Sequence, residues 1–115
     1  MSTTIYHNPR CSKSRAALAL LQERDEEIEV IEYLKTPPTK EALEHILSLL
    51  GKEPRELMRK KEAPYIENNL GDPSLSRETL IQALVDYPKL IERPIVLKNN
   101  QAAIGRPIED VLAIL

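Results

Sequence analysis

The single cysteine of this 115-residue chain, Cys11, stands in a polar and basic stretch between two predicted elements. An apolar strand pattern and an Asn8-Pro9 turn precede it, and a helical pattern follows it. A thiol at this junction lies where the first unpaired N–H groups of the helix point. Together with Lys13 and Arg15, these groups favour the thiolate and are expected to lower the pKa of Cys11 below about 8.5. The same donors can hold a tetrahedral oxyanion beside the sulfur, so the stretch predicts an enzyme with a nucleophile and an anion site.

An inert, buried thiol is the alternative interpretation of Cys11, because most free cysteines behave as small hydrophobic residues. The neighbouring side chains argue against it. Arg10 and residues 12–15 are polar or basic and would be costly to bury. We therefore favour a reactive cysteine.

The composition is that of one soluble globular domain, expected to span residues 1–115. Hydrophobic residues make up 42% of the chain and charged residues 30%, and the net charge of −2 gives no reason to expect nucleic acid as a partner. No apolar run approaches the roughly 18 residues that a membrane span needs, and the first residues do not form a signal-peptide pattern. We expect a cytoplasmic protein with no membrane association.

The cysteine count also limits the chemistry. One cysteine excludes an internal disulfide, which agrees with a reducing compartment. Any redox cycle must then take its second thiol from another molecule. Cys11, His7 and His45 lack the spacing of metal ligands, so neither a metal nor a bound cofactor is expected. We interpret His45 as an exposed surface histidine.

The first part of the chain predicts a strand, a helix and a second strand. The strands are expected at residues 3–6 and 28–33, and either Ser12 or Ser14 can provide the N-cap of the helix between them. Residues 16–21 are all apolar, which indicates a helix buried on nearly all sides. A β-α-β order of this kind implies two parallel strands with a right-handed crossover.

The middle of the chain, from about residue 39 to 90, predicts helices. Their boundaries are expected at residue types that commonly begin or end helices: Thr39, Gly51, Pro54, Ser76 and Pro88. Residues 64–73 are expected to be irregular.

The last part predicts a hairpin and a helix. Strands at residues 95–97 and 101–104 flank an Asn99-Asn100 turn, and Pro107 takes the first position of the helix. The helix is expected to turn four apolar side chains inward: Ile108, Val111, Leu112 and Leu115.

The complete order, β-α-β, then helices, then β-β-α, is that of an α/β protein with a thioredoxin-like fold and a helical insertion at about residues 39–90. This fold has a cis-proline before its third strand, so we expect a cis bond between Arg93 and Pro94. An ordinary trans proline at the start of an edge strand is the alternative.

Three arginines are candidates for binding an oxyanion, because a guanidinium can bind one through two N–H groups. Arg59 lies at the end of a short helix expected from Pro54 onward, although it belongs to a basic run that is more often a solvated face. Arg93 would face the cysteine if it preceded a cis-proline in this fold. Arg106 precedes a helix start, where a cation is unfavourable unless an anion lies nearby.

Four spaced motifs together resemble the glutaredoxin-coupled arsenate reductase family. They are HNPRCSKSR at residues 7–15, RKKEAPY at 59–65, IERPIV at 91–96 and GRP at 105–107, and the resemblance covers essentially the whole chain. Two features resemble a shorter chromosomal branch of that family. The chain ends at Leu115, directly after the last predicted helix, and the loop has basic residues at positions 10 and 13.

The resemblance implies a role for each candidate. Cys11 is implied as the nucleophile, His7 and Ser14 as residues that help to activate its thiolate, and Arg15 as the arginine that closes the family's His-x-x-x-Cys-x-x-x-Arg pattern. The oxyanion-binding triad is implied to be Arg59, Arg93 and Arg106. The implied reaction reduces arsenate to arsenite through a covalent Cys11–arsenic intermediate, with glutathione as co-substrate and glutaredoxin as partner.

Two other functions stay open. A glutathione-dependent thiol-disulfide oxidoreductase would need Cys11 and glutathione but not three convergent arginines. A redox-responsive regulator that binds RNA polymerase usually carries Cys-x-x-Cys, whereas here the fourth position is Ser14. A cysteine phosphatase is excluded, because the spacing from Cys11 to Arg15 is too short for its phosphate loop.

Overall fold

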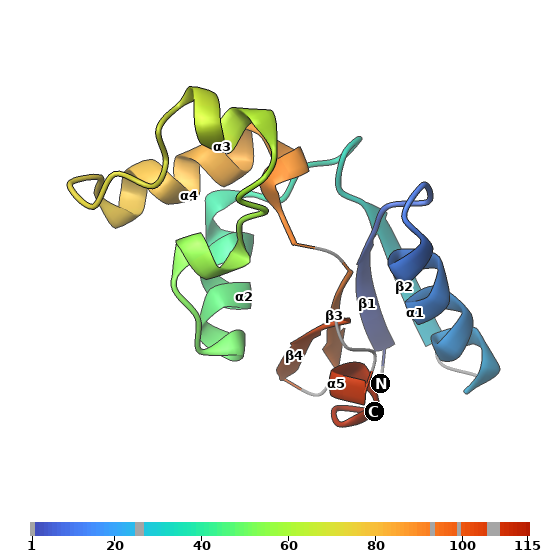
Figure 1. Ribbon diagram of the computed structural model, residues 1–115. Coiled ribbons are helices and arrows are strands. Elements are labelled where there is room, and N and C mark those ends of the chain that lie inside the picture. The colour runs from blue at the N-terminus through green and yellow to red at the C-terminus, as the bar shows by residue number, and fades with distance from the viewer. Residues whose placement is uncertain (1, 25–26, 93, 99, 106–108) are drawn as a thin grey trace. The chain divides into compact units, whose positions relative to one another are not determined.

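The computed structural model describes residues 2–24, 27–92, 94–98, 100–105 and 109–115 (Figure 1). The chain divides into two compact units, one made of Met1–Thr36 with Arg93–Leu115 and the other of Pro37–Glu92. The first unit contains the β-sheet, and the second consists of helices joined by loops. The single domain expected from the chain length stays a prediction.

A four-stranded sheet organises the first unit. Its strands are β1 (Ser2–His7), β2 (Glu27–Glu32), β3 (Ile95–Lys98) and β4 (Gln101–Ile104), in the order β2-β1-β3-β4. The β1–β2 pair is parallel, whereas β1–β3 and β3–β4 are antiparallel. The predicted α/β, thioredoxin-like fold with its β-α-β and β-β-α halves is therefore confirmed.

Helix α1 (Ser12–Glu23) covers one face of this sheet. The core of the unit consists of apolar side chains from the strands, α1 and the C-terminal helix: Ile5, Ala17, Leu21, Val96, Ala103 and Val111. The prediction that α1 is buried on nearly all sides is wrong, since Ala16 and Ala19 are exposed. Alanine has the highest helix propensity and little apolar surface, so an all-apolar run can still lie half in solvent.

The β3–β4 hairpin and helix α5 (Glu109–Leu112) complete the unit. Lys98 pairs with Gln101, and Asn100 has a left-handed φ of 61°, as a tight hairpin turn requires. Val111 is fully buried, and Leu115 packs against the core as expected. Leu112 is 42% exposed, so its predicted inward position is wrong. The predicted helix start at Pro107 and the inward position of Ile108 lie outside the described residues.

The second unit begins with α2 (Lys40–Leu50), followed by the 3₁₀ turn η1 (Pro54–Leu57), α3 (Ala63–Glu67), α4 (Arg77–Asp86) and the 3₁₀ turn η2 (Pro88–Leu90). Thr39 Oγ1 accepts from the Ala42 N–H at 3.1 Å, and Ser76 Oγ accepts from the Thr79 N–H at 3.1 Å. Gly51 ends α2 with a left-handed φ of 67°. The predicted caps and the predicted stop of α2 are therefore confirmed, and His45 is exposed as expected.

The expectation of irregular chain at residues 64–73 is only partly correct, because α3 occupies residues 63–67. Pro64 lies in its first turn, where a proline lacks no helical hydrogen bond. The loop that follows is held by Arg55, whose Nε donates to the Leu70 carbonyl at 3.0 Å and whose Nη2 donates to the Asp72 carbonyl. These contacts are long-range in sequence, so the local pattern did not predict them.

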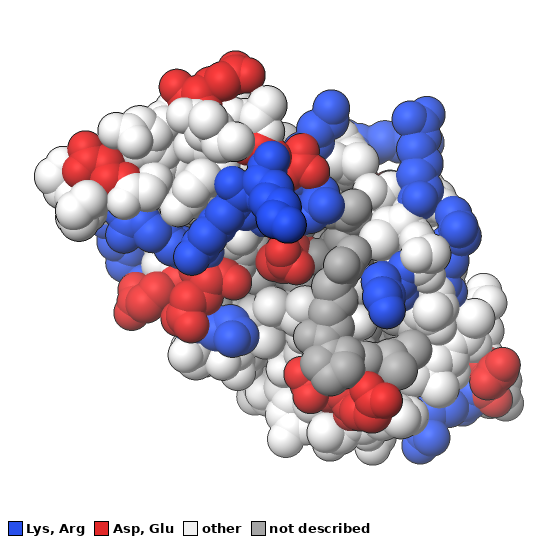
Figure 2. Space-filling view, in the orientation of Figure 1, with Lys and Arg blue, Asp and Glu red and all other residues white. Residues whose placement is uncertain are grey.

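Within the described residues, no helix combines the length and apolar character that crossing a membrane requires. Lys and Arg side chains lie among Asp and Glu side chains on the face drawn in Figure 2, in keeping with the net charge of −2.

Candidate active site

Cys11 is the N-cap residue of α1, with extended backbone angles of φ −97° and ψ 123°. Its N–H donates to the Asn8 carbonyl at 3.0 Å, and its carbonyl accepts from the Arg15 N–H at 3.0 Å. The predicted cap at Ser12 or Ser14 is therefore wrong, because the helix begins one residue after the cysteine. The Cys11 thiol therefore belongs to the N-cap residue of the helix. At this end the unpaired N–H groups and the positive end of the helix dipole favour an anion.

Ser14 joins the end of β1 to the first turn of α1. Its Oγ lies 2.6 Å from His7 Nδ1 and accepts from the Asn8 N–H at 3.0 Å. Ser14 is fully buried and His7 is 6% exposed, so the hydrogen bond between them is sheltered from water, whereas the bond from the Asn8 N–H is partly buried. This triangle of residues fixes the loop that carries Cys11 against the strand.

The environment of His7 favours its neutral ring. Burial is the largest cause and lowers the pKa of His7 below its ordinary value, and the positive charge of Arg15 lowers it further, whereas Glu32 opposes the shift. A neutral imidazole carries one donor and one acceptor nitrogen. It can therefore hydrogen-bond Ser14 through one nitrogen while the other stays available to accept or donate a proton.

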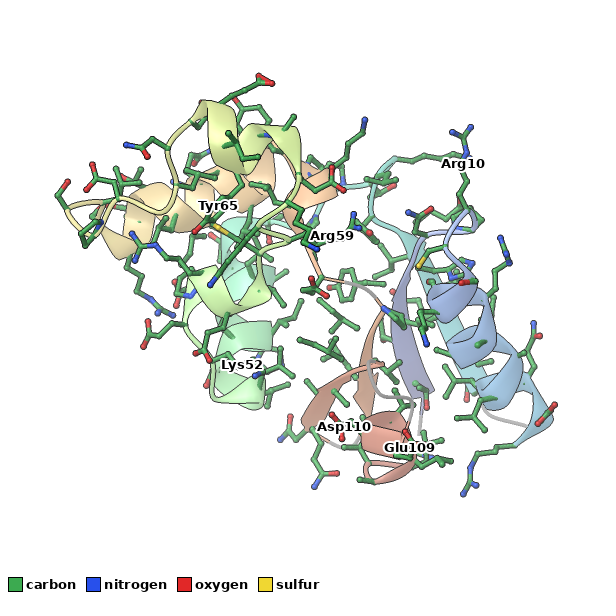
Figure 3. All side chains as sticks on the ribbon, viewed as in Figure 1. Arg10, Lys52, Arg59, Tyr65, Glu109 and Asp110 are labelled. Atoms are coloured by element: carbon green, nitrogen blue, oxygen red, sulfur yellow. The ribbon has the colours of Figure 1, made fainter. Side chains whose placement is uncertain are left out.

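Two arginines flank the cysteine loop. Arg15 Nη1 donates to the Pro9 carbonyl at 3.0 Å, which folds this exposed side chain back over the turn. The Arg10 N–H donates to Asn8 Oδ1 at 3.0 Å, and Figure 3 shows the Arg10 side chain extending outward from the tip of the loop. The structure thus brings His7, Cys11, Ser14 and Arg15 together at one end of β1, and their catalytic roles stay predictions.

Arg59 lies in the second unit, in a segment that is tied to the chain just before Arg93. Its N–H donates to the Leu90 carbonyl at 2.7 Å, and the Glu92 N–H donates to the Leu57 carbonyl at 2.8 Å. Met58 and Ile91 form an antiparallel bridge between these two hydrogen bonds. The Arg59 segment is consequently fixed beside the segment that leads into Arg93.

The other two members of the predicted triad, Arg93 and Arg106, lie outside the described residues, and so does the predicted cis bond between Arg93 and Pro94. The convergence of the three guanidinium groups stays a prediction. The sequence analysis did not predict the ion pair of Arg59, whose Nη1 donates to the carboxylate of Glu62, three residues further along the chain. The i, i+3 spacing of opposite charges was the available signal.

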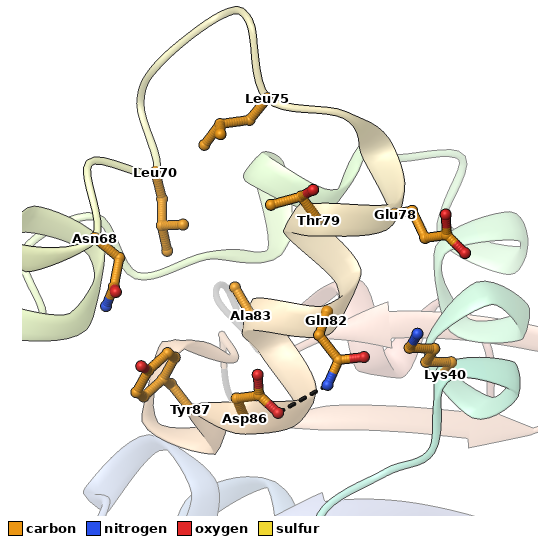
Figure 4. A pocket seen from close by; sticks show the side chains of 10 residues that line it. All are labelled: Lys40, Asn68, Leu70, Leu75, Glu78, Thr79, Gln82, Ala83, Asp86 and Tyr87. Carbon is orange, nitrogen blue, oxygen red and sulfur yellow. Dashed lines mark hydrogen bonds between the residues drawn. The ribbon is translucent and has the colours of Figure 1, made fainter.

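A groove of about 440 Å³ runs beside α4 in the second unit (Figure 4). Leu70, Leu75 and Ala83 supply apolar surface, and Gln82 Nε2 donates to Asp86 Oδ1 at 2.8 Å along its edge. None of the predicted site residues that the structure describes lines this groove. Among the described residues, no group of three or more His, Cys, Asp or Glu side chains is arranged to hold a metal ion.

The fold and the position of Cys11 define a thioredoxin-like protein with one cysteine at the start of its first helix. The sequence pattern of the ArsC family matches residues 6–114, and the chain belongs to that family.

Similar proteins cover almost the whole chain. An uncharacterized protein of Escherichia coli K12, YfgD, is 59% identical over 96% of this chain and 94% of its own length. An arsenate reductase of Neisseria meningitidis serogroup A is 51% identical, with 96% of both chains covered. The solved structure of an arsenate reductase from Vibrio cholerae has a TM-score of 0.96 and 53% identity, and covers 100% of this chain and 98% of its own.

Proposed function

We propose that this protein is an arsenate reductase that uses glutathione and glutaredoxin as its reductants. The observation that carries the proposal is the position of Cys11 at the N-cap of α1, beside the buried His7–Ser14 pair. The similarity to arsenate reductases along nearly the whole chain supports the choice of substrate.

The proposed reaction begins when the Cys11 thiolate attacks arsenic and water leaves, which gives a Cys11–arsenic(V) adduct. Glutathione then replaces a second oxygen, and a Cys11–arsenic–glutathione adduct forms. A glutaredoxin thiol attacks the glutathione sulfur, so that two electrons pass to arsenic and a glutaredoxin–glutathione disulfide forms. Water then replaces the Cys11 sulfur on arsenic(III), so that arsenite leaves and Cys11 returns to its thiolate with release of a proton. Because the chain has one cysteine, both reducing thiols must come from other molecules.

Three arginines are proposed to neutralise the oxyanion as charge redistributes: Arg59, Arg93 and Arg106. The tie between residues 57–59 and residues 90–92 supports this part of the proposal, since it fixes Arg59 beside the chain that leads into Arg93. His7, Ser14 and Arg15 are proposed to support the Cys11 thiolate. A cytoplasmic location follows from the proposal, because glutathione and glutaredoxin act in reducing compartments.

The deciding experiment measures arsenate-dependent oxidation of glutathione in the presence of glutaredoxin. Wild type should turn over, Cys11→Ser should not, and omission of either glutathione or glutaredoxin should abolish the signal. Reduction of a glutathione mixed disulfide without arsenate turnover would favour the thiol-disulfide oxidoreductase. If neither substrate is turned over and the protein instead binds RNA polymerase, the regulator is supported and the proposal is wrong.

Arg59→Ala separates arsenate reduction from general thiol exchange. Loss of a charge-assisted contact of about 1.5–3 kcal/mol predicts arsenate turnover about ten- to a hundredfold lower. Lys60→Ala is the matched control, because Lys60 is the exposed neighbour in the same basic run. Attack of Cys11 on a neutral disulfide should be unaffected by either change. Equal losses with arsenate and disulfide would mean that Arg59 serves the fold instead of the oxyanion.

A further inference from the structure

We propose that Glu62 determines which oxyanions the site accepts, by selecting protonated oxyanions such as arsenate and phosphate against fully deprotonated sulfate. This inference rests on the proposed function, because it takes Arg59 as an oxyanion-binding residue. It concerns a residue for which the sequence motif by itself indicates no role.

The Arg59–Glu62 pair is a defined local structure. Arg59 Nη1 donates to Glu62 Oε1, and the Glu62 N–H donates to the Arg59 carbonyl at 3.1 Å, so that the side-chain contact closes a backbone turn. Glu62 is also the residue that precedes α3, and its side chain makes no cap hydrogen bond to that helix. Its carboxylate is therefore directed at the arginine and not at the helix end.

The pair is more sheltered than the other ion pairs of the described chain. Both side chains are 29% exposed, whereas the partners in the remaining pairs are 41–78% exposed. A surface pair adds little to stability, and shielding an arginine with a carboxylate weakens its attraction for anions. A carboxylate in this position lowers the general anion affinity of Arg59, and besides closing the turn it can discriminate between anions.

The hydrogen-bonding capacity of the two side chains explains how that selection works. A guanidinium has five N–H donors, and among the described residues only one side-chain contact, to Glu62, engages that of Arg59. The second oxygen of Glu62 has no partner in the described part of the chain, and the proposal places an oxyanion on the remaining N–H groups within reach of it. A carboxylate oxygen accepts hydrogen bonds and cannot donate them.

The charge state of the ligand then decides the outcome. Arsenate and phosphate keep at least one proton at neutral pH, and that O–H can donate to Glu62. Sulfate has no proton to donate, so a sulfate oxygen and the Glu62 carboxylate oxygen would face each other as two hydrogen-bond acceptors. Both groups are negatively charged and would repel each other. Specificity would thus come from a repulsive contact against the wrong ligand in addition to an attractive contact with the correct one.

The test compares wild type with Glu62→Gln, because the amide keeps the shape, removes the charge and adds an N–H donor. Binding of phosphate and of sulfate is measured by calorimetry, which does not depend on turnover. Both anions are also tested as competitive inhibitors of arsenate reduction. Glu44→Gln is the matched control, since Glu44 pairs with Arg77 in an exposed ion pair of the same unit. Thermal unfolding of each variant checks that the fold is kept.

We expect the ratio of sulfate to phosphate dissociation constants to fall at least tenfold in Glu62→Gln, with sulfate binding more tightly, and to stay unchanged in Glu44→Gln. An unchanged ratio in Glu62→Gln, together with arsenate turnover that depends on Arg59, overturns the role of Glu62 and leaves the proposed function intact. If wild type neither binds phosphate nor reduces arsenate, the proposed function and this inference both fail. If Glu62→Gln is unfolded, Glu62→Ala is measured in its place, with the same expectation for the ratio.

Discussion

The hydrogen bonds of Ser14 allow the effect of Ser14→Ala on stability to be worked out from the structure. The hydroxyl is fully buried and serves both His7 Nδ1 and the Asn8 N–H. Alanine would leave these two polar groups without their partner, at a cost of about 1–3 kcal/mol each. The better helix propensity of alanine returns about 0.5 kcal/mol. We expect a net decrease of about 1.5–5.5 kcal/mol in the free energy of unfolding.

Urea denaturation, followed by circular dichroism, measures this decrease. Ser12→Ala is the control, because Ser12 is exposed in the first turn of the same helix. That change should alter the free energy of unfolding by less than about 0.5 kcal/mol. If the two variants lose the same amount, the Ser14 hydroxyl does not hold the cysteine loop against β1, and the reasoning from burial is refuted.

Three further predictions concern pH and backbone geometry. Burial lowers the pKa of His7, so the unfolded chain protonates this ring at a higher pH than the folded chain does. The free energy of unfolding should therefore fall as the pH drops from about 6.5 towards the lower pKa of the folded state. Denaturation at several pH values measures the fall, and an NMR titration that places the His7 pKa above 6.5 would contradict its cause. Gly105→Ala should cost about 1–3 kcal/mol, because a Cβ there would lie 2.6 Å from Pro94 Cγ; a Tm equal to wild type would show that the proline ring moves aside. Gly51→Ala should cost about 1 kcal/mol through its left-handed φ of 67° alone, since no described residue beyond its two chain neighbours has an atom within 4 Å of the added carbon, and an unchanged Tm would contradict this.

The sequence by itself determined the order of the strands and of the longer helices, and the ends of α2 and the start of α4. Caps such as Thr39 and Ser76, and the stop at Gly51, act within one turn of chain, so residue type is enough to predict them. The sequence also isolated Cys11 as the candidate nucleophile, because it is the one cysteine of the chain and stands in a polar and basic stretch; the structure nevertheless buries Cys11 and Ser14.

Local sequence patterns predicted the burial of side chains and their hydrogen-bond partners less well than they predicted helix ends. The apolar run of α1 suggested burial on all sides, although the sheet covers only one face of a helix that it packs against. Serine is a common N-cap residue, so Ser14 is a candidate cap, yet its hydroxyl hydrogen-bonds to His7, seven residues earlier in the chain. A hydroxyl can serve either partner, and only the packing of α1 on β1 decides between them.

Tertiary structure alone decided how the segments of the helical second unit are tied to one another. Residues 57–59 and 90–92 are some thirty positions apart in the chain, and their hydrogen bonds depend on how the helices between them fold back. The same holds for Arg55, which binds two carbonyls of a loop fifteen and seventeen residues away. Hydrogen bonds between distant segments have no period in the sequence, because they form only after packing has brought their donors and acceptors within reach.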